Sequence, residues 1–197
     1  MLSMTTQEAT QQTLDRFRRT GAYLTGHFRL TSGLHSAEYL QSALVLQHPS
    51  LAEELGRALA AQLPRAAIVV SPAIGGLIIG HEVARALSAR FLFAERDASG
   101  KMTLRRGFSV QPGETAVVIE DVVTTGGTTR EVIDLLQNSG AQVLAAGSII
   151  DRSGGHAGLG VPRAALATLE VVSYREEECP LCRQGIAIEK PGSRPAR

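Results

Sequence analysis

Two neighbouring acids and a run of threonines and glycines give this sequence its clearest chemical signal. Glu120 and Asp121 follow the short apolar run 116–119, and the segment TTGGTT at 124–129 comes just after them. A turn with two glycines can point several backbone N–H groups into one concavity. A helix that starts there adds its unpaired N-terminal N–H groups and its positive dipole end. This combination is typical of a phosphate-binding site.

The two carboxylates need a different ligand from the loop beside them. A carboxylate repels a phosphate, so Glu120 and Asp121 are better suited to bind the 2′- and 3′-hydroxyls of a ribose, or to lie near a bound Mg²⁺. Together with the loop they predict a site for a ribose 5-phosphate. The alternative is an ordinary strand-to-helix turn whose acids and glycines serve only solubility and turn geometry. The spacing matches neither GxxxxGK[ST] nor GxGxxG.

The surrounding segments predict the elements that position these residues. Apolar, β-branched residues lead into the acids, and helical spacing follows from about residue 129 until 138–140 ends the helix. The same alternation along the chain predicts an α/β fold with a doubly wound, mostly parallel five-stranded sheet. The expected strands are 67–71, 91–94, 116–119, 142–150 and 164–172. Such sheets bind ligands at the carboxyl ends of their strands, which is where the acids fall.

Three further helices are expected to cover this sheet. The first spans residues 7–19. The second has Ser50 as its N-cap, with Glu53 completing a capping box, and Pro64 ends it. The third, 77–89, follows a glycine-containing turn.

Composition limits the classes of function. The chain has 197 residues, 44% of them hydrophobic and 20% charged, which suits one globular domain with a substantial core. Its net charge of +1 gives no basic field for nucleic acid or an anionic membrane, so we expect small-molecule partners. We find no apolar run of about 18 residues, no secretory signal and no disulfide framework. We therefore expect a cytoplasmic protein.

Residues 117–132, VVIEDVVTTGGTTREV, resemble the phosphoribosyl-diphosphate signature of the type I phosphoribosyltransferases. The resemblance implies the type I phosphoribosyltransferase fold, with the two acids facing the ribose and the loop holding its 5′-phosphate. It also implies Mg²⁺ held through the diphosphate, with no protein side chain as a direct metal ligand. The residues assigned to 5-phosphoribosyl 1-diphosphate are Glu120, Asp121, Val122, Val123, Thr124, Thr125, Gly126, Gly127 and Thr128, with Gly75, Arg96 and Lys101. The signature leaves the base open.

The N-terminal part resembles the hood of the orotate phosphoribosyltransferases, whose pattern reads roughly G-x-F-x-L-K-S-G-x-x-S followed by aromatics. The matching residues are Gly26, Phe28, Leu30, Ser32, Gly33, Ser36 and Tyr39. Thr31 stands where that family usually has a lysine. The resemblance places Tyr39 at the orotate site, whereas plain core packing is the alternative for Tyr39 and Phe28.

Arg152 lies 32 positions after Glu120, where orotate phosphoribosyltransferases carry an arginine that meets the pyrimidine carboxylate. A planar guanidinium binds a carboxylate bidentately. The resemblance assigns Arg152, Tyr39 and Thr124 to orotate. The alternative is an arginine that only faces solvent at the end of a strand.

The turn at 72–76, PAIGG, lies beside the diphosphate in the resembled family. Gly75 and Gly76 suit a turn that exposes backbone N–H groups. The family often has a lysine at the position of Gly75, so here the backbone must supply that contact. A glycine-rich helix start in any α/β domain is the alternative.

The charged segment 95–108 corresponds in the family to a mobile catalytic flap that closes over the diphosphate of a neighbouring subunit, which implies a homodimer. Arg96 matches the arginine at the start of the flap, but the common pattern R-K-x-x-K-x-H-G does not follow. Which of Lys101, Arg105 and Arg106 reaches the substrate stays open. From the residues alone, a solvated hairpin is the alternative.

Cys179 and Cys182 form a CxxC pair near the C-terminus. Such a pair suggests half of a zinc site or a redox pair, and a stable zinc site would need histidine donors or a partner subunit. We treat 1–197 as one domain with a helix and hood (1–48), a core (49–175) and a tail (176–197).

These features together predict the transfer of 5-phosphoribosyl from 5-phosphoribosyl 1-diphosphate to orotate, giving orotidine 5′-phosphate and diphosphate in pyrimidine synthesis. The catalytic candidates are Arg96, Lys101 and Asp121: the cations stabilise charge on the leaving diphosphate, and the carboxylate stabilises positive character at the anomeric carbon. Two alternatives stay open. One is a purine-base phosphoribosyltransferase, which has no use for Arg152. The other is a non-catalytic regulator that senses the phosphoribosyl diphosphate and binds nucleic acid, although the sequence shows no helix-turn-helix.

Overall fold

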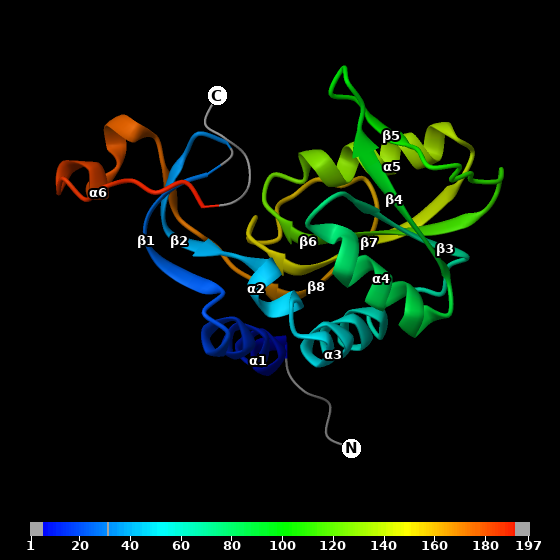
Figure 1. The fold of residues 1–197 in the computed structure, drawn as a ribbon, viewed down its shortest axis with the longest axis horizontal. Helices are drawn as coiled ribbons and strands as arrows, with labels where there is room; N and C mark the ends of the chain where they lie inside the picture. The colour runs from blue at the N-terminus through cyan, green and yellow to red at the C-terminus, as the bar shows by residue number, and fades with distance from the viewer. Residues whose placement is uncertain (1–5, 31, 192–197) are drawn as a thin grey trace.

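The computed structural model describes residues 6–30 and 32–191, so Thr31 lies outside the described residues. Its centre is a six-stranded sheet in the order β5-β4-β3-β6-β7-β8 (Figure 1). The strands are β3 (Ile68–Pro72), β4 (Arg90–Arg96), β5 (Met102–Leu104), β6 (Thr115–Val123), β7 (Gln142–Asp151) and β8 (Arg163–Thr168). The strands from β4 through β3, β6 and β7 to β8 run parallel, which confirms the predicted doubly wound, mostly parallel sheet.

The sheet has six strands where five were predicted, because β5 was not expected from the sequence. β5 pairs antiparallel with β4, with Leu104 opposite Ala94 and Met102 opposite Arg96. Its three residues lie within a charged segment and are too few to show an alternating pattern. The segment 95–108 therefore begins as a hairpin that projects from the edge of the sheet (Figure 1).

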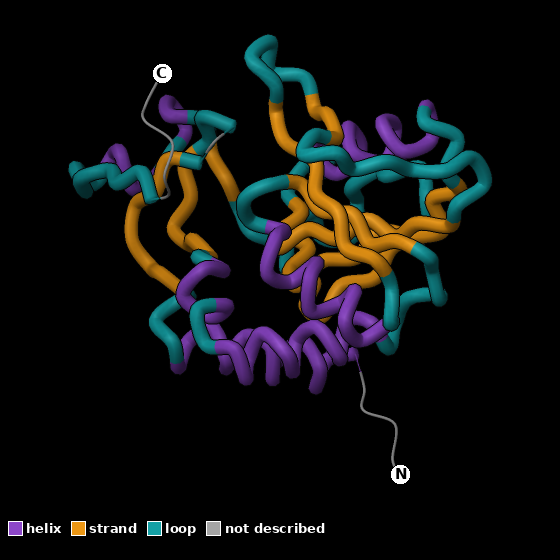
Figure 2. Tube along the Cα trace, turned by 45° about the vertical axis from the view of Figure 1, so that its right-hand side comes forward, coloured by secondary structure: helices purple, strands orange, loops and turns teal. Residues whose placement is uncertain are grey.

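Helices cover both faces of the main sheet (Figures 1 and 2). They are α1 (Thr6–Arg19), α3 (Pro49–Ala60) and α4 (Gly76–Leu87) on one face, and α5 (Gly127–Asn138) on the other. Phe17 and Ile79 belong to the apolar cluster on the first face, and Val132 and Leu136 to the cluster on the second. None of the helices among the described residues is long and apolar enough to cross a membrane.

The start of α3 corrects the predicted capping box. His48 is the N-cap, Pro49 is the first helical residue, and no side chain caps the helix. Because the fixed φ of proline suits the first helical position, the helix begins one residue before the predicted N-cap Ser50. Glu53 instead forms an ion pair with Arg57 at 3.1 Å.

A second, antiparallel sheet in the order β1-β2-β9 lies beside the main sheet, and we call it the hood sheet (Figure 2). Its strands are β1 (Tyr23–Arg29), β2 (His35–Leu40) and β9 (Ser173–Tyr174), and the short helix α2 (Ser42–Leu46) leads from it to α3. The predicted strand 164–172 ends earlier, at Thr168, and the chain then crosses to the hood. Residues 175–191, the C-terminal segment, contain the 3₁₀ helix η1 (Glu176–Glu178) and α6 (Pro180–Arg183).

Candidate functional site

The Thr/Gly loop leads from β6 into α5, as predicted. Glu120 and residues 122–129 line a small pocket at this point. Gly126 has a φ of +77°, in the left-handed region that favours glycine. A Cβ on Gly126 would lie 2.6 Å from Leu159 Cδ2 and 3.3 Å from Ala157 Cβ. The backbone conformation therefore favours glycine at position 126, and the close approach of these side chains adds to that preference.

The start of α5 offers N–H donors at this pocket. The first helical hydrogen bond runs from Arg130 N–H to Gly126 O at 2.9 Å. The N–H groups of residues 127–129 therefore have no carbonyl partner within the helix. Thr124 and Thr125 are exposed and add hydroxyl donors beside them. With the positive end of the helix dipole, this loop can bind a phosphate group.

The two acids differ in burial, because successive residues of a strand face opposite sides of the sheet. Glu120 is only 8% exposed, and its carboxylate accepts the Asp121 N–H at 3.3 Å. Burial raises the pKa of Glu120 well above its ordinary value, and the negative charge of Asp121 raises it further. Asp121 is half-exposed. The pair thus places a carboxyl group that resists ionisation beside an accessible carboxylate.

Replacing Glu120 with glutamine should stabilise the free protein increasingly as the pH rises. A carboxyl group whose pKa is raised by folding contributes its stabilisation fully below the unfolded-state pKa and loses it as the pH rises toward the folded-state pKa. The window therefore extends upward from the ordinary value of 4.5. Thermal unfolding of both proteins from about pH 5 to about pH 8 measures the difference. Exposed Glu177→Gln is the control, and a pH-independent difference for Glu120→Gln would contradict the assignment.

Asp121 lies against the turn between β3 and α4. A Cβ on Gly75 would lie 2.6 Å from Asp121 Oδ1, and a Cβ on Gly76 would lie 2.9 Å from Ile119 O. With Asp121 in this position, the lysine that the family often carries at position 75 does not fit. The structure thus brings two predicted site residues, Gly75 and Asp121, into contact.

Arg152 lies between β7 and the hood sheet. Its backbone N–H donates to Val123 O at 2.8 Å, next to the Thr/Gly loop. Burial lowers the pKa of Arg152, and the negative charge of Glu38 in the hood opposes this. Its Nε is buried and has no hydrogen-bond partner among the described residues. Because an unpaired buried N–H is unfavourable, this environment suits an anionic ligand.

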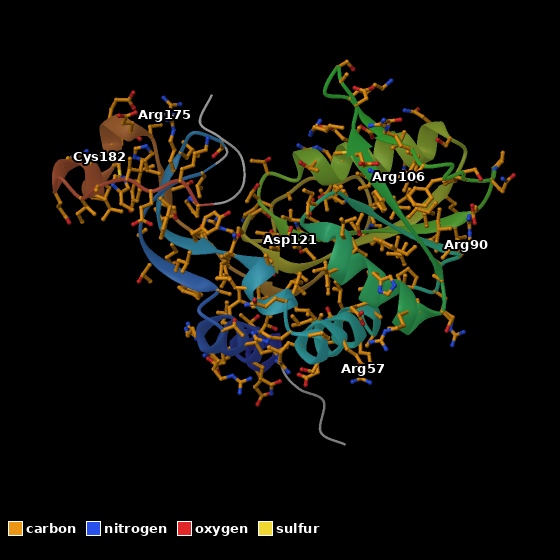
Figure 3. All side chains as sticks on the ribbon, viewed as in Figure 1. Arg57, Arg90, Arg106, Asp121, Arg175 and Cys182 are labelled. Carbon is orange, nitrogen blue, oxygen red and sulfur yellow. The ribbon has the colours of Figure 1, made fainter. Side chains whose placement is uncertain are left out.

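Tyr39 of the hood lies near both Arg152 and Asp121. Its ring packs against Phe28, with the ring centroids 5.8 Å apart. Burial raises the pKa of Tyr39, Asp121 raises it further, and Arg152 lowers it. Tyr39 of the hood therefore lies close enough to both Arg152 and Asp121 to feel their charges. Figure 3 shows Asp121 on the side of the core that faces the hood sheet.

The hairpin after β4 holds its cations apart from the two acids. Arg96 binds the carboxylate of Glu131 on α5 through both terminal nitrogens, at 2.7 and 3.1 Å. Arg106 binds Glu95 through two nitrogens, both at 2.8 Å. Lys101 is exposed just after the hairpin turn. Among the described contacts, Arg96 and Lys101 make none with the acids of the site, so their roles stay predictions.

Two buried histidines that were not predicted from the sequence lie beside the CxxC pair in the structure. His27 of β1 and His35 of β2 lie with Cys179 and Cys182 in one cluster. Both histidines fall in segments expected to be extended. The presence of two such histidines in a chain with a CxxC pair was the only available signal of a four-ligand cluster. The contact between Arg96 and Glu131 was also missed, although Glu131 belongs to the signature.

Comparison with known sequences gives matches along nearly the whole chain. The model of the phosphoribosyl transferase domain matches residues 44–158. The orotate phosphoribosyltransferase of Pelotomaculum thermopropionicum is 57% identical over 180 residues, which are 90% of this chain and 94% of that protein. The orotate phosphoribosyltransferase of Heliobacterium modesticaldum is 53% identical over 187 residues, which are 93% of this chain and 97% of that protein.

Solved structures share the fold. Orotate phosphoribosyltransferase from Aeropyrum pernix superposes with a TM-score of 0.68 at 28% identity, covering 79% of this chain and 93% of that one. Adenine phosphoribosyltransferase from Thermoanaerobacter pseudethanolicus has a TM-score of 0.66 at 16% identity, covering 79% of this chain and 99% of that one. The second likeness concerns the fold alone. The predicted fold is confirmed.

Proposed function

Because this chain belongs to the orotate phosphoribosyltransferase family, we infer that it transfers the 5-phosphoribosyl group of 5-phosphoribosyl 1-diphosphate to orotate. The products are orotidine 5′-phosphate and diphosphate, and the reaction belongs to pyrimidine synthesis. The observation that carries the choice of base is the half-buried Arg152, whose buried Nε lacks a partner among the described residues. Orotate carries a carboxylate that can pair with this guanidinium, whereas adenine and hypoxanthine carry none.

The site orders the two substrates along the strand ends. The 5′-phosphate binds the N–H groups of residues 127–129, and the ribose hydroxyls then reach Glu120 and Asp121. Orotate lies against Tyr39 with its carboxylate on Arg152. The ionised ring nitrogen attacks the anomeric carbon as the bond to the diphosphate oxygen breaks. The ring nitrogen of orotate is acidic enough to ionise without a general base. Holding both reactants in this geometry then supplies most of the rate acceleration.

Mg²⁺ is the cofactor in this proposal, held through the diphosphate rather than by a direct protein ligand. The residues fit such an ion, because Mg²⁺ usually keeps several waters and the accessible carboxylate of Asp121 can accept hydrogen bonds from them without binding the ion directly. When bound, the ion neutralises charge on the leaving diphosphate. Asp121 itself orients the ribose and stabilises positive character at the anomeric carbon.

The proposal includes a cytoplasmic homodimer in which the hairpin of each subunit closes over the site of the other. Lys101 is exposed near the hairpin turn and so is available to a neighbouring site. Arg96 must first leave Glu131, which it binds at 2.7 Å. We therefore assign the first contact with the diphosphate to Lys101.

Replacing Lys101 with alanine should lower kcat by about 10²- to 10³-fold, since one donor to the leaving group is lost. Lys101→Arg should retain most of the activity, because it keeps the charge. Mixing Lys101→Ala with Arg152→Ala subunits, followed by subunit exchange, tests the shared flap. A heterodimer then has one site with an intact Arg152 and a flap from the other subunit, so activity should return. No recovery in a proven heterodimer would contradict a flap that acts between subunits.

The proposed reaction is tested by mixing the full-length protein with orotate, 5-phosphoribosyl 1-diphosphate and Mg²⁺. Orotate absorbance should fall, and mass spectrometry should identify orotidine 5′-phosphate and diphosphate in equal amounts. Omitting either substrate is the control. If the phosphoribosyl diphosphate binds but no product forms, the chain is a sensor rather than an enzyme and the proposal is wrong.

A further inference from the structure

Four metal-binding side chains meet away from the substrate site. His27 comes from β1, His35 begins β2, and Cys179 and Cys182 lie at either end of the first turn of α6. One ligand atom of each lies within 4.8 Å of every other. Cys179 is fully buried and both histidines are 3% exposed. Figure 3 shows Cys182 in the part of the molecule formed by the hood and the C-terminal segment, well apart from Asp121.

Four of the six distances between the ligand atoms lie close to the edge lengths of a metal tetrahedron. His27 Nε2 lies 3.1 Å from His35 Nδ1, 3.6 Å from Cys179 Sγ and 3.7 Å from Cys182 Sγ. Cys182 Sγ lies 3.2 Å from His35 Nδ1. A tetrahedral zinc ion with Zn–N of about 2.05 Å and Zn–S of about 2.3 Å separates its ligand atoms by about 3.3 to 3.8 Å. An ion at the centre therefore needs only small side-chain adjustments.

The outer contact of His27 sets the tautomer that a metal requires. Its Nδ1 lies 2.8 Å from Ile186 O. A carbonyl oxygen can only accept, so Nδ1 carries the proton and Nε2 presents a lone pair to the cluster. Metal-binding histidines commonly donate the N–H of their other ring nitrogen to a backbone carbonyl in this way. The C-terminal segment is further fixed by hydrogen bonds from Glu189 N–H to His27 O at 2.7 Å and from Arg29 N–H to Glu189 O at 2.8 Å.

The hood has little apolar core of its own to hold this segment. The buried residues of β1 and β2 are His27, Phe28, His35, Ser36 and Leu40, three of which are polar. Small substructures with few buried apolar residues commonly depend on a metal ion or a disulfide. A cross-link between β1, β2 and α6 would stabilise the packing of the C-terminal segment on the hood.

We propose that His27, His35, Cys179 and Cys182 bind one Zn²⁺ ion in a closed, structural site that fastens the C-terminal segment to the hood sheet. Two thiolates and two imidazoles suit a borderline-soft cation of tetrahedral preference. Four protein ligands leave no open position for substrate or water, so the ion has no part in the chemistry of the phosphoribosyl site.

Metal analysis of the full-length protein tests this site. Protein purified without chelator and without a histidine tag should contain about one zinc ion per chain, as measured by inductively coupled plasma mass spectrometry. Cys182→Ser and His35→Asn should each lose most of this zinc. His48→Asn, which changes an exposed histidine outside the cluster, should keep all of it.

Cobalt replacement gives a readout that does not depend on the variants folding. Co²⁺ bound to the reduced wild-type protein should show intense tetrahedral visible bands and thiolate-to-cobalt charge transfer, and added zinc should abolish both. Chelator treatment should also expose the C-terminal segment to trypsin at Arg175 or Arg183 while the core stays intact. The proposal is wrong if the reduced protein binds neither zinc nor cobalt. It is equally wrong if the natural protein carries a Cys179–Cys182 disulfide instead of the metal.

Discussion

Replacing Arg152 with alanine should lower kcat/KM for orotate by about 10²- to 10³-fold, with little change in the KM for 5-phosphoribosyl 1-diphosphate. Removing one partner of a buried charged pair costs about 2–5 kcal/mol, because the other charge is left unpaired. Here the orotate carboxylate would lose its guanidinium in the space beside Tyr39. Initial rates with each substrate varied in turn separate the two effects.

Two variants sharpen this result. Arg152→Lys keeps the charge but loses bidentate binding, so its activity should be intermediate. Arg57→Ala removes an exposed arginine of α3 and should behave as wild type, since Figure 3 places Arg57 far from Asp121. Thermal unfolding of Arg152→Ala should stay close to wild type, because the Nε of that side chain makes no hydrogen bond in the described structure. Unchanged orotate turnover by a folded Arg152→Ala enzyme would show that Arg152 does not bind orotate.

Replacing Gly126 with alanine should lower kcat/KM for 5-phosphoribosyl 1-diphosphate by about 10²-fold, because misplacing a substrate by about 1 Å has an effect of that size. The new Cβ would lie 2.6 Å from Leu159 Cδ2 and 3.3 Å from Ala157 Cβ, so the loop must shift unless the Leu159 side chain moves away. The free energy of unfolding should also fall by about 2–4 kcal/mol, from the left-handed backbone and the overpacking together. Steady-state kinetics and thermal unfolding measure the two effects.

Gly113→Ala is a matched control for Gly126→Ala. Gly113 has a φ of +78°, almost the same as Gly126, but nothing lies within 4 Å of its added Cβ. This variant should therefore show backbone strain alone, about 1–2 kcal/mol, with normal kinetics. If Gly126→Ala binds the phosphoribosyl diphosphate as well as Gly113→Ala does, the loop is not the phosphate site.

The sequence was most informative where its signals are local. The strand, acids, Thr/Gly loop and helix from Thr115 to Asn138 are contiguous, so the order of residue types predicted the strand and the helix that the structure shows. Phosphate binding by the loop between them stays a prediction. The buried parallel strands were predictable for the same reason, because each is a single apolar run. Resemblance to the family assigned Arg152 and Tyr39 to the site, and the structure brings Tyr39 close to both Arg152 and Asp121.

The features that were not predicted depend on contacts between distant residues. The pairing of Arg96 with Glu131 joins residues 35 positions apart, and the contact between His27 and Cys179 joins residues 152 positions apart. No local pattern reports such pairs. The wrong prediction of Ser50 as the N-cap had a different cause. The preference of Pro49 for the first helical position outweighs the preference of Ser50 and Glu53 for a capping box.

The measurement that tests the central claim most directly is kcat/KM for orotate against uracil, adenine and hypoxanthine under the same conditions. Uracil is orotate without its carboxylate, so the comparison isolates the group that we assign to Arg152. A site built to pair with a ligand group rejects an analogue that lacks it by about 10⁴-fold or more. We predict turnover of orotate with at least this preference over uracil and none with the two purines. Equal use of uracil, or preference for a purine, would contradict the account.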